Sequence, residues 1–281
     1  MANTTISTSA VNKKAMLADA VLASMERQLV WENTVDSSFS DMVKGGGGQV
    51  LTVPKATTPS AGSKSAGSDV TYGADTHGSF TITVDQHKYV AKQIETSSQV
   101  WTQPSMFAME TNQFGYALAK AVDDYIEGVA EADTGSISDL GADNTFTSAL
   151  IRTGMTSLMG ADVPFDGNVF LTVNPASYAS LLAIEDFVDS SKYGNSAPVQ
   201  TGVIGKLYGI EIRSSNSISG VADADEAGYL YHRSAIAFAR AMDVKVEMDY
   251  SVSALADQVV AHTIYGGALA FADRLYEYHN I

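Results

Sequence analysis

The sequence has no cysteine among its 281 residues. Disulfide bonds, zinc sites with thiolate ligands and catalytic thiols are therefore excluded. No stretch approaches the roughly eighteen consecutive apolar residues of a membrane-spanning helix, so we expect no contact with a membrane. Because 45% of the residues are hydrophobic, the chain can bury the core of one large or two moderate domains. We expect its stability to come from packing and subunit association.

Basic residues are few in the second part of the chain. Residues 1–120 hold 9 basic and 10 acidic side chains, whereas residues 121–281 hold 8 basic and 22 acidic ones. The net charge of −15 therefore comes almost entirely from residues 121–281. Tight DNA binding requires lysine and arginine side chains that displace counterions from phosphates. This charge argues against a protein that reads DNA sequence, but it allows a container that contacts packaged DNA only non-specifically.

Large apolar residues are almost absent between Lys55 and Ser79, where only Val70 and Tyr72 occur among serine, glycine, threonine and alanine. Such a segment buries too little surface to offset the entropy lost when it becomes ordered. Strand-like alternation flanks it on both sides. The flanking segments are Gln49–Pro54, Phe80–Val84 and Tyr89–Ile94. The pattern predicts a long hairpin with a polar tip, which a partner chain orders.

The first residues, Met1–Asn12, are small and polar, and they indicate a flexible arm. An amphipathic helix should follow, because apolar residues recur at every fourth position and end near Trp31. These residues are Leu17, Val21, Met25 and Leu29. The run Gly45–Gly48 then provides a hinge or spacer before the first strand.

A long helix is predicted from Pro104 to about Ala132, since proline suits the first turn of a helix. At 1.5 Å per residue it would be roughly 40 Å long, which is the length of a spine. An apolar stripe at helical spacing runs along it. The stripe consists of Phe114, Leu118, Ala121, Tyr125 and Val129.

Charged residues should occupy the other faces of this helix, namely Lys120, Asp123, Asp124 and Glu127. Neighbouring helical residues point about 100° apart. The pair Asp123–Asp124 is therefore not expected to act as a catalytic dyad.

The middle of the chain alternates between helices and strands. A loop at Asp133–Asn144, without basic residues, separates it from the spine helix. In the predicted helix that starts at Asn174–Pro175, asparagine suits the cap and proline the first turn. The other expected elements are a helix at Thr145–Met159, a strand at Asn168–Val173, continuation of the capped helix to Ile184, and a strand pair with tight turns at Gly202–Ile212.

The last stretch is predicted to be β structure around one helical turn. Gly266–Gly267 should separate the final two strands as a tight turn or bulge. The expected segments are Gly228–His232, Ser234–Ala241, Val244–Tyr250, Gln258–Tyr265 and Ala268–Tyr278.

Nucleotide and calcium motifs fail at defined positions. A phosphate-binding loop needs lysine and a hydroxyl residue after its last glycine, but Gln49–Val50 follow the glycine run and Leu207 follows Gly205–Lys206. Asp223, Asp225 and Gly228 resemble the start of a calcium loop. Its later ligand positions hold Ala227 and Ser234, which argues against calcium binding.

Histidine spacing also gives no motif. None of the five has a second histidine or a carboxylate three or four residues away, the spacing of helical metal sites. We interpret each of them, His77, His87, His232, His262 and His279, as a surface or strand residue. There is no Gly-x-Ser-x-Gly elbow either. We therefore expect no catalytic residue, no cofactor, no cofactor-binding residue and no metal ligand.

The order of these features resembles the major capsid protein of tailed bacteriophages, whose fold is shared with encapsulins. Each motif is weak alone, but together they span residues 13–278 in the family's order. The motifs are Gly45–Pro54 at the entry to an extended loop, Phe80–Ala91 in the returning strand, Gly115–Ile126 in the spine helix, and Phe170–Leu182, Gly205–Asn216 and Tyr229–Ala239 in and after the axial domain.

The resemblance implies an α+β fold with four parts. These are an N-terminal arm at 1–44, an extended β-hairpin loop at 45–100, a peripheral domain with the spine helix at 101–145 and 244–281, and an axial domain at 146–243. In this fold the extended loop lies across the neighbouring subunit. That placement would explain a hairpin without a core of its own.

The resemblance also implies a function without catalysis. The chain would assemble with itself into pentamers and hexamers of an icosahedral shell that encloses double-stranded DNA, formed in the cytoplasm of a bacterial host and retained in the virion. A separate scaffolding protein, a portal and a decoration protein are its expected partners. Some relatives cross-link a loop lysine to a neighbour's asparagine; Lys55 and Lys64 lie in that segment, but no matching asparagine is identified.

Three other functions stay open at this point. An encapsulin-type nanocompartment would have the same fold and an enzyme as cargo. A secreted or surface-layer β protein would suit the acidic, cysteine-free composition, although the long helix argues against it. An enzyme has the least support, because no catalytic motif is present.

Overall fold

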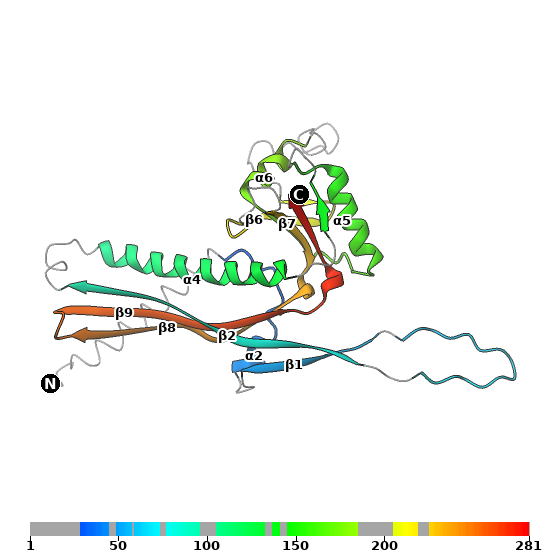
Figure 1. The fold of residues 1–281 in the computed structure, drawn as a ribbon, viewed down its shortest axis with the longest axis horizontal. Coiled ribbons are helices and arrows are strands. Elements are labelled where there is room, and N and C mark those ends of the chain that lie inside the picture. Colours follow the sequence, from blue (N-terminus) through cyan, green and yellow to red (C-terminus); the bar gives the residue numbers. More distant parts are fainter. Residues whose placement is uncertain are drawn as a thin grey trace, which may run out of the picture.

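The structure is a computed structural model that describes residues 29–44, 49–57, 59–73, 77–95, 105–132, 137–140, 145–184, 205–218 and 225–280. The predicted arm, most of the amphipathic helix and the run Gly45–Gly48 lie outside the described residues. Figure 1 shows an elongated body of one helix on a long sheet, a second unit above one end of it, and a hairpin that projects beyond both.

The long sheet is antiparallel and has four strands in the order β1-β2-β9-β8. Strand β1 (Val50–Lys55) pairs with β2 (Gly78–Glu95), from Val50 opposite Thr83 to Lys55 opposite Gly78. This pairing confirms the predicted hairpin and its polar tip, residues 56–77. The remaining strands are β9 (Ala256–Leu269) and β8 (Ile236–Ser251).

Two predicted strand breaks do not exist. The strands expected at Phe80–Val84 and Tyr89–Ile94 are one strand, β2, and those expected at Ser234–Ala241 and Val244–Tyr250 belong mostly to β8. One short turn, η1 (Arg233–Ala235), precedes β8. The polar residues at the supposed breaks mark a solvent-facing side of the sheet, which a strand tolerates without ending.

Gly266 lies inside β9 and does not separate two strands as predicted. The register of β2 shifts between Thr83 and Gln86, opposite this glycine, so the predicted bulge is present on the neighbouring strand. A Cβ atom on Gly266 would lie 2.1 Å from the carbonyl oxygen of Thr83. Glycine is required here because the two backbones approach too closely for any side chain.

Helix α4 (Ser105–Glu131) covers one face of the long sheet and confirms the predicted spine (Figure 1). Its 27 residues correspond to roughly 40 Å. Its buried face is rotated from the predicted stripe, because Ala121 and Val129 are only partly buried. Asp123 and Glu127, expected on faces outside the apolar stripe, are buried. The apolar residues on that face are Phe114, Leu118, Ala119, Val122, Ile126 and Ala130.

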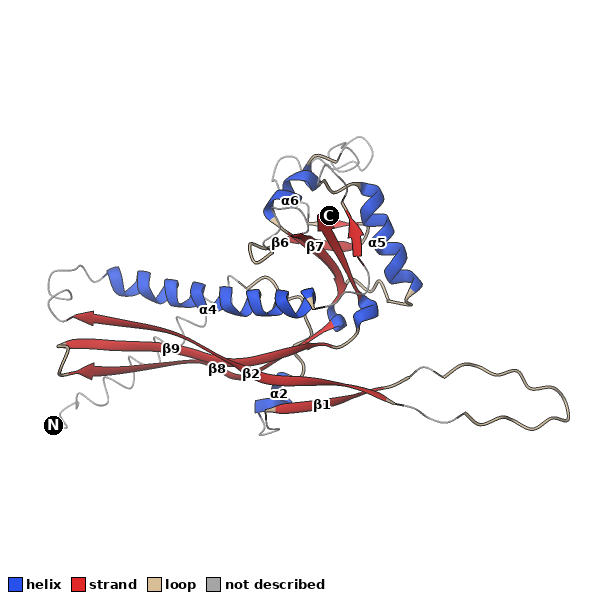
Figure 2. Cartoon of the chain, viewed as in Figure 1, coloured by secondary structure: helices blue, strands red, loops and turns tan. Residues whose placement is uncertain are grey.

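The second unit is a mixed six-stranded sheet in the order β3-β10-β7-β4-β6-β5. Its core is aliphatic and aromatic, with Leu171, Ile210 and Leu230 fully buried. Figure 2 shows that helices α5 (Ser148–Gly160) and α6 (Pro175–Leu182) flank it. The strands are β3 (Ile137–Asp139), β4 (Val169–Val173), β5 (Lys206–Leu207), β6 (Ile210–Ser214), β7 (Asp225–His232) and β10 (Leu275–Asn280).

Local capping explains where both helices begin. The Thr147 side chain accepts a hydrogen bond from the Leu150 N–H. Asn174 Oδ1 accepts one from the Ser177 N–H at 2.6 Å, and Pro175 occupies the first turn. A side-chain acceptor here satisfies an N–H group that has no partner within the helix. The predicted helix start at Asn174–Pro175 is confirmed.

Two strands of the six-stranded sheet, β3 and β10, lie outside residues 146–243, the range predicted for the axial domain. Strand β3 lies within the predicted loop Asp133–Asn144, and it pairs in parallel with β10. Strand β10 follows the turn η2 (Ala272–Arg274) and pairs with β7. The sequence-based boundaries placed both strands in the peripheral domain. Three residues of β3 are too short for a periodic signal, so only pairing defines it.

Candidate assembly surfaces

The hairpin tip, residues 56–77, is solvent-exposed at every described position. Its two large apolar side chains are exposed as well, Val70 by 54% and Tyr72 by 91%. Figure 1 shows that the tip projects away from both sheets. No described residue of the chain therefore supplies a core for it, as the sequence predicted.

The root of the hairpin, by contrast, is anchored on a small core of its own. Phe80 of β2 packs edge-on against Phe39 at 5.9 Å between ring centroids and lies 6.4 Å from Phe271. Ile82 and Val84 are buried in the same cluster. The base of the projecting loop is thus fixed, which sets the direction in which the tip extends.

Lysines of the extended loop lie in different surroundings. The Lys55 ammonium lies 4.2 Å from the centroid of the Phe271 ring, within cation–π range, and Arg274 lies over the same ring. Lys64 is exposed in the tip. Neither lysine has a cross-linking asparagine identified from the sequence, so no cross-link is predicted.

A short segment before the sheet, Leu29–Asp36, is here named the arm clamp. Trp31 is fully buried, stacks on Tyr231 at 5.3 Å with 10° between the rings, and meets Tyr229 edge-on at 5.6 Å. The Thr34 and Tyr231 hydroxyls lie 2.5 Å apart. Burial raises the pKa of Tyr231 to about 12, so its hydroxyl stays neutral. The arm clamp joins strand β7 to the rest of the core.

Asp123 of α4 fixes the arm clamp from the other side. Its carboxylate accepts hydrogen bonds from the backbone N–H groups of Val30 at 2.9 Å and Trp31 at 3.1 Å. Burial raises the pKa of the Asp123 carboxyl to about 6, while these N–H groups act in the opposite direction. Asp124 is exposed, so the two carboxylates do not form a dyad.

Further polar contacts hold the end of the arm clamp. Glu32 forms a largely buried ion pair with Arg240 of β8. The Arg233 Nε donates to the Val35 carbonyl oxygen at 3.2 Å. Asp36 forms a parallel bridge with Ala237, and its N–H and carbonyl oxygen bond to neighbouring β8 backbone groups. These backbone hydrogen bonds attach the end of the arm clamp to β8, the edge strand of the long sheet.

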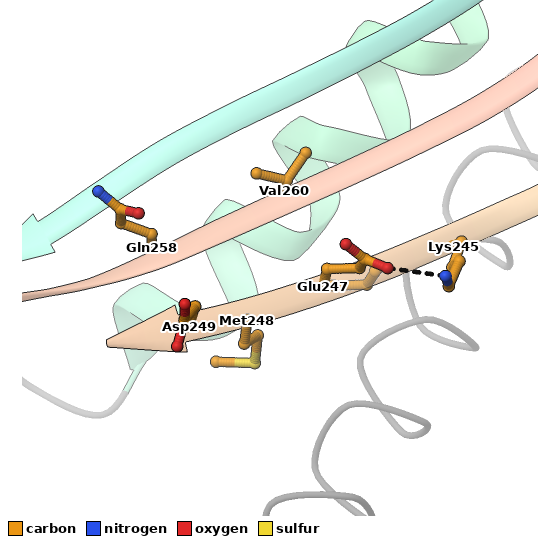
Figure 3. A pocket seen from close by; sticks show the side chains of 7 residues that line it. Lys245, Glu247, Met248, Asp249, Gln258 and Val260 are labelled. Atoms are coloured by element: carbon orange, nitrogen blue, oxygen red, sulfur yellow. Dashed lines mark ion pairs between the residues drawn. The ribbon is translucent and has the colours of Figure 1, made fainter. Parts of the chain in front are cut away.

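An open depression over β8 and β9, seen in Figure 3, is lined by Lys245, Glu247, Met248, Asp249, Gln258 and Val260. Lys245 and Glu247 form an exposed ion pair at 2.7 Å. Among the residues that the structure describes, no group of three or more histidines and carboxylates is placed to hold a metal ion.

The histidines differ in their burial and in the groups they contact. His232 is buried and lies 3.4 Å from an Asp166 carboxylate oxygen, and the His279 ring contacts Glu277 at 2.5 Å. His87 and His262, far apart in the sequence, lie against each other on β2 and β9. His77 is exposed at the end of the hairpin tip.

Sequence reasoning missed the residues of the arm clamp contacts. The sequence pattern puts Trp31 near the end of an amphipathic helix and Asp123 outside the apolar stripe of the spine helix. The sequence holds one signal for Asp123, because this residue lies four positions after the apolar Ala119 and next to the apolar Val122. A carboxylate on an apolar helix face indicates a buried polar contact.

These features describe a subunit with buried cores and a hairpin tip that is exposed at every described position. A family model for phage capsid proteins matches residues 127–274, more than half of the chain. The chain therefore belongs to the phage capsid protein family. It is a major capsid protein and a non-enzymatic structural component of the virion. A search of curated proteins gave no match.

Solved structures show the same mixed α+β fold. A structure from Mycobacterium phage Che8 superposes with a TM-score of 0.74 at 23% identity, covering 89% of this chain and 90% of that one. The capsid of cyanophage P-SCSP1u gives 0.65 at 16% identity, with 83% of each chain covered. The capsid of a native GTA particle gives a TM-score of 0.64 at 12% identity, with 83% of this chain and 85% of that one covered.

Across the described helices, no segment is both long and apolar enough to cross a membrane.

Proposed function

We propose that this capsid protein forms pentamers and hexamers of an icosahedral shell around packaged double-stranded DNA, and that its hairpin tip lies across the neighbouring subunit. The observation that carries the proposal is the tip, which is exposed at every described position, with Tyr72 91% exposed, on a root packed in a small core. An aromatic side chain buries roughly 150–250 Å² when it packs. A neighbouring copy of the chain can supply the surface that this side chain lacks in its own subunit.

Shell stability follows from the number of contacts made by each subunit. A single interface of modest area gives limited affinity. Each subunit in a closed shell meets several neighbours at once. Once the first contact has formed, the next one is intramolecular, so the overall affinity of the subunit for the shell far exceeds that of one contact. The loop of each subunit would add one such contact to a neighbour.

The acidic chain suits a container for DNA. With 22 acidic against 8 basic side chains over residues 121–281, the chain lacks the lysine and arginine density for tight phosphate binding. Packaged DNA would then touch the shell only non-specifically. A scaffolding protein, a portal and a decoration protein complete the proposed partners, with assembly in the bacterial cytoplasm.

The proposed parts follow sheet membership. The arm ends in the arm clamp, and the extended loop is the hairpin with its tip. The peripheral domain comprises α4 and the long sheet. The axial domain comprises the six-stranded sheet, including β3 and β10, with α5 and α6. The family match favours a phage shell over an encapsulin-type compartment.

Replacing the hairpin tip tests the proposal directly. Because Lys55 lies opposite Gly78, an Asn-Gly turn in place of residues 56–77 should close the hairpin without strain. We expect a folded subunit, by circular dichroism and urea unfolding, that forms no intact shells in electron micrographs under conditions where the wild-type protein does.

A matched control keeps the tip and changes only an exposed polar side chain in it, Ser63→Ala. It should form normal shells. Intact shells from the variant without a tip would refute the proposed role of the loop.

A further inference from the structure

Two histidines from distant parts of the sequence meet on the long sheet. His87 of β2 and His262 of β9 are 175 residues apart, yet His87 Nε2 lies 3.0 Å from His262 Nδ1. Their ring centroids are 5.2 Å apart with 49° between the rings. Tyr89 pairs with His262 and His87 pairs with Ile264, so the histidines are diagonal neighbours. Diagonal side chains of this size reach each other across antiparallel strands.

The histidine pair is accessible from solvent. Val90, which follows Tyr89 on β2, packs on the main core beneath α4. Since strand residues alternate between faces, His87 and Tyr89 lie on the opposite face, and Tyr89 is 69% exposed. His87 is exposed and His262 is partly buried. An ion can reach both rings without disturbing the core.

We propose that His87 and His262 form a binding site for a divalent first-row transition-metal ion, with Cu²⁺ preferred over Zn²⁺. Imidazole nitrogens bind such ions at about 2.0–2.1 Å. Two nitrogens on one ion, at an angle between 90° and 109°, are then about 2.8–3.4 Å apart. The observed 3.0 Å falls in this range. The preference for Cu²⁺ follows the general order of affinity for nitrogen ligands.

The binding step is an exchange. Each imidazole binds the ion as a neutral ring through the lone pair of one nitrogen. The ring that carries its proton on the binding nitrogen gives that proton to solvent and takes one up on its other nitrogen, so the two neutral rings bind without net proton release. Water occupies the remaining coordination positions, because the site has two protein ligands. The site is therefore an open one.

The surroundings tolerate a cation. Lys245 lies opposite His262 on β8, but its ammonium is 2.7 Å from the Glu247 carboxylate, which offsets its charge locally. The chain as a whole carries a net charge of −15, which attracts cations. A bound ion would tie β2, the strand that continues into the hairpin tip, to β9 beyond the bulge at Gln86.

Copper titration of tag-free, metal-stripped protein tests the site. We expect calorimetry to give one Cu²⁺ per chain and electron paramagnetic resonance to show coupling to two imidazole nitrogens. Since two linked ligands bind more tightly than one, H87Q and H262Q should each weaken binding roughly tenfold or more. Excess Zn²⁺ should raise the melting temperature of the wild-type protein, because it binds the folded state.

The matched control is H77Q, which removes an exposed histidine of the hairpin tip and should leave Cu²⁺ affinity unchanged. The proposal is overturned if the wild-type protein binds Cu²⁺ no more tightly than the H87Q/H262Q double variant. It is also overturned if H77Q weakens binding as much as H262Q. Neither result depends on whether the shell assembles.

Discussion

The arm clamp and the hairpin tip are both mostly irregular, but their surroundings differ completely. The arm clamp places Trp31 and Val35 at zero exposure, whereas the tip leaves Tyr72 91% exposed. Backbone N–H groups of the arm clamp have a buried carboxylate as partner, in Asp123. Irregular chain is therefore ordered by a few buried apolar side chains and by partners for its backbone, and regular secondary structure is not required.

The comparison also separates two kinds of stability. Contacts of the arm clamp lie within one subunit, so they act before assembly. The tip has its large apolar side chains free to pack on another molecule, so in the proposed shell its contribution appears only after assembly. Substitutions in the two segments should consequently affect different measurements.

The largest expected effect is that of Trp31→Ala. It removes a fully buried indole and its stacking on Tyr231, and it leaves a cavity in the main core. The free energy of unfolding of the isolated subunit should fall by about 3–5 kcal/mol in urea titrations. A loss below about 1 kcal/mol would mean that the arm clamp is not part of the folding core.

The next effect concerns pH and Asp123. Its pKa in the folded subunit is about 6, above the usual value of 3.8. Between these values the folded state keeps a proton that the unfolded state has lost, so this group contributes stability below pH 3.8 that is lost as the pH rises through 6. The total change is about 3 kcal/mol.

Comparison with Asp123→Ala isolates this contribution from other titrating groups. Unfolding free energies measured between pH 4 and pH 7 should show that the variant's deficit shrinks as the pH rises. Asp124→Ala, which changes the exposed neighbouring carboxylate, should show no such trend. A deficit that is constant over this range would exclude titration of Asp123.

The smallest effect on the subunit is expected for Tyr72→Ser in the tip. A side chain that is 91% exposed should change the free energy of unfolding of its own subunit by no more than about 0.5 kcal/mol. Shell yield, counted in electron micrographs, should nevertheless fall, because the neighbouring copy loses an aromatic contact. Equal shell yields for the variant and the wild-type protein would show that the Tyr72 side chain does not contribute to assembly. The backbone of the loop would then make the contact with the neighbouring subunit.

Elements with strong local signals were predicted well. The spine helix α4 follows from Pro104 and helical periodicity, α6 from its Asn174 cap and Pro175, and the hairpin from alternation around a polar stretch. In each case neighbouring residues carry the signal. The positions of strand ends were predicted poorly, because polar residues on a solvent-facing strand look like loop residues.

Contacts between distant residues had no signal in a single sequence. His87 and His262 meet only because β2 and β9 pair, and Asp123 meets the arm clamp only because α4 packs beside it. Strand β3 exists because β10 offers it a free edge.

From the amino-acid sequence alone it follows that the chain has no disulfides, is acidic in its second part, and is built around a long helix and a hairpin whose tip has no core. Composition and local periodicity are enough for these conclusions, because they depend on neighbouring residues. Folding in three dimensions is needed to pair the strands, to bury Asp123 beneath the arm clamp, and to bring two histidines to one side of the sheet. Those outcomes depend on packing between segments that the chain brings together only when it folds.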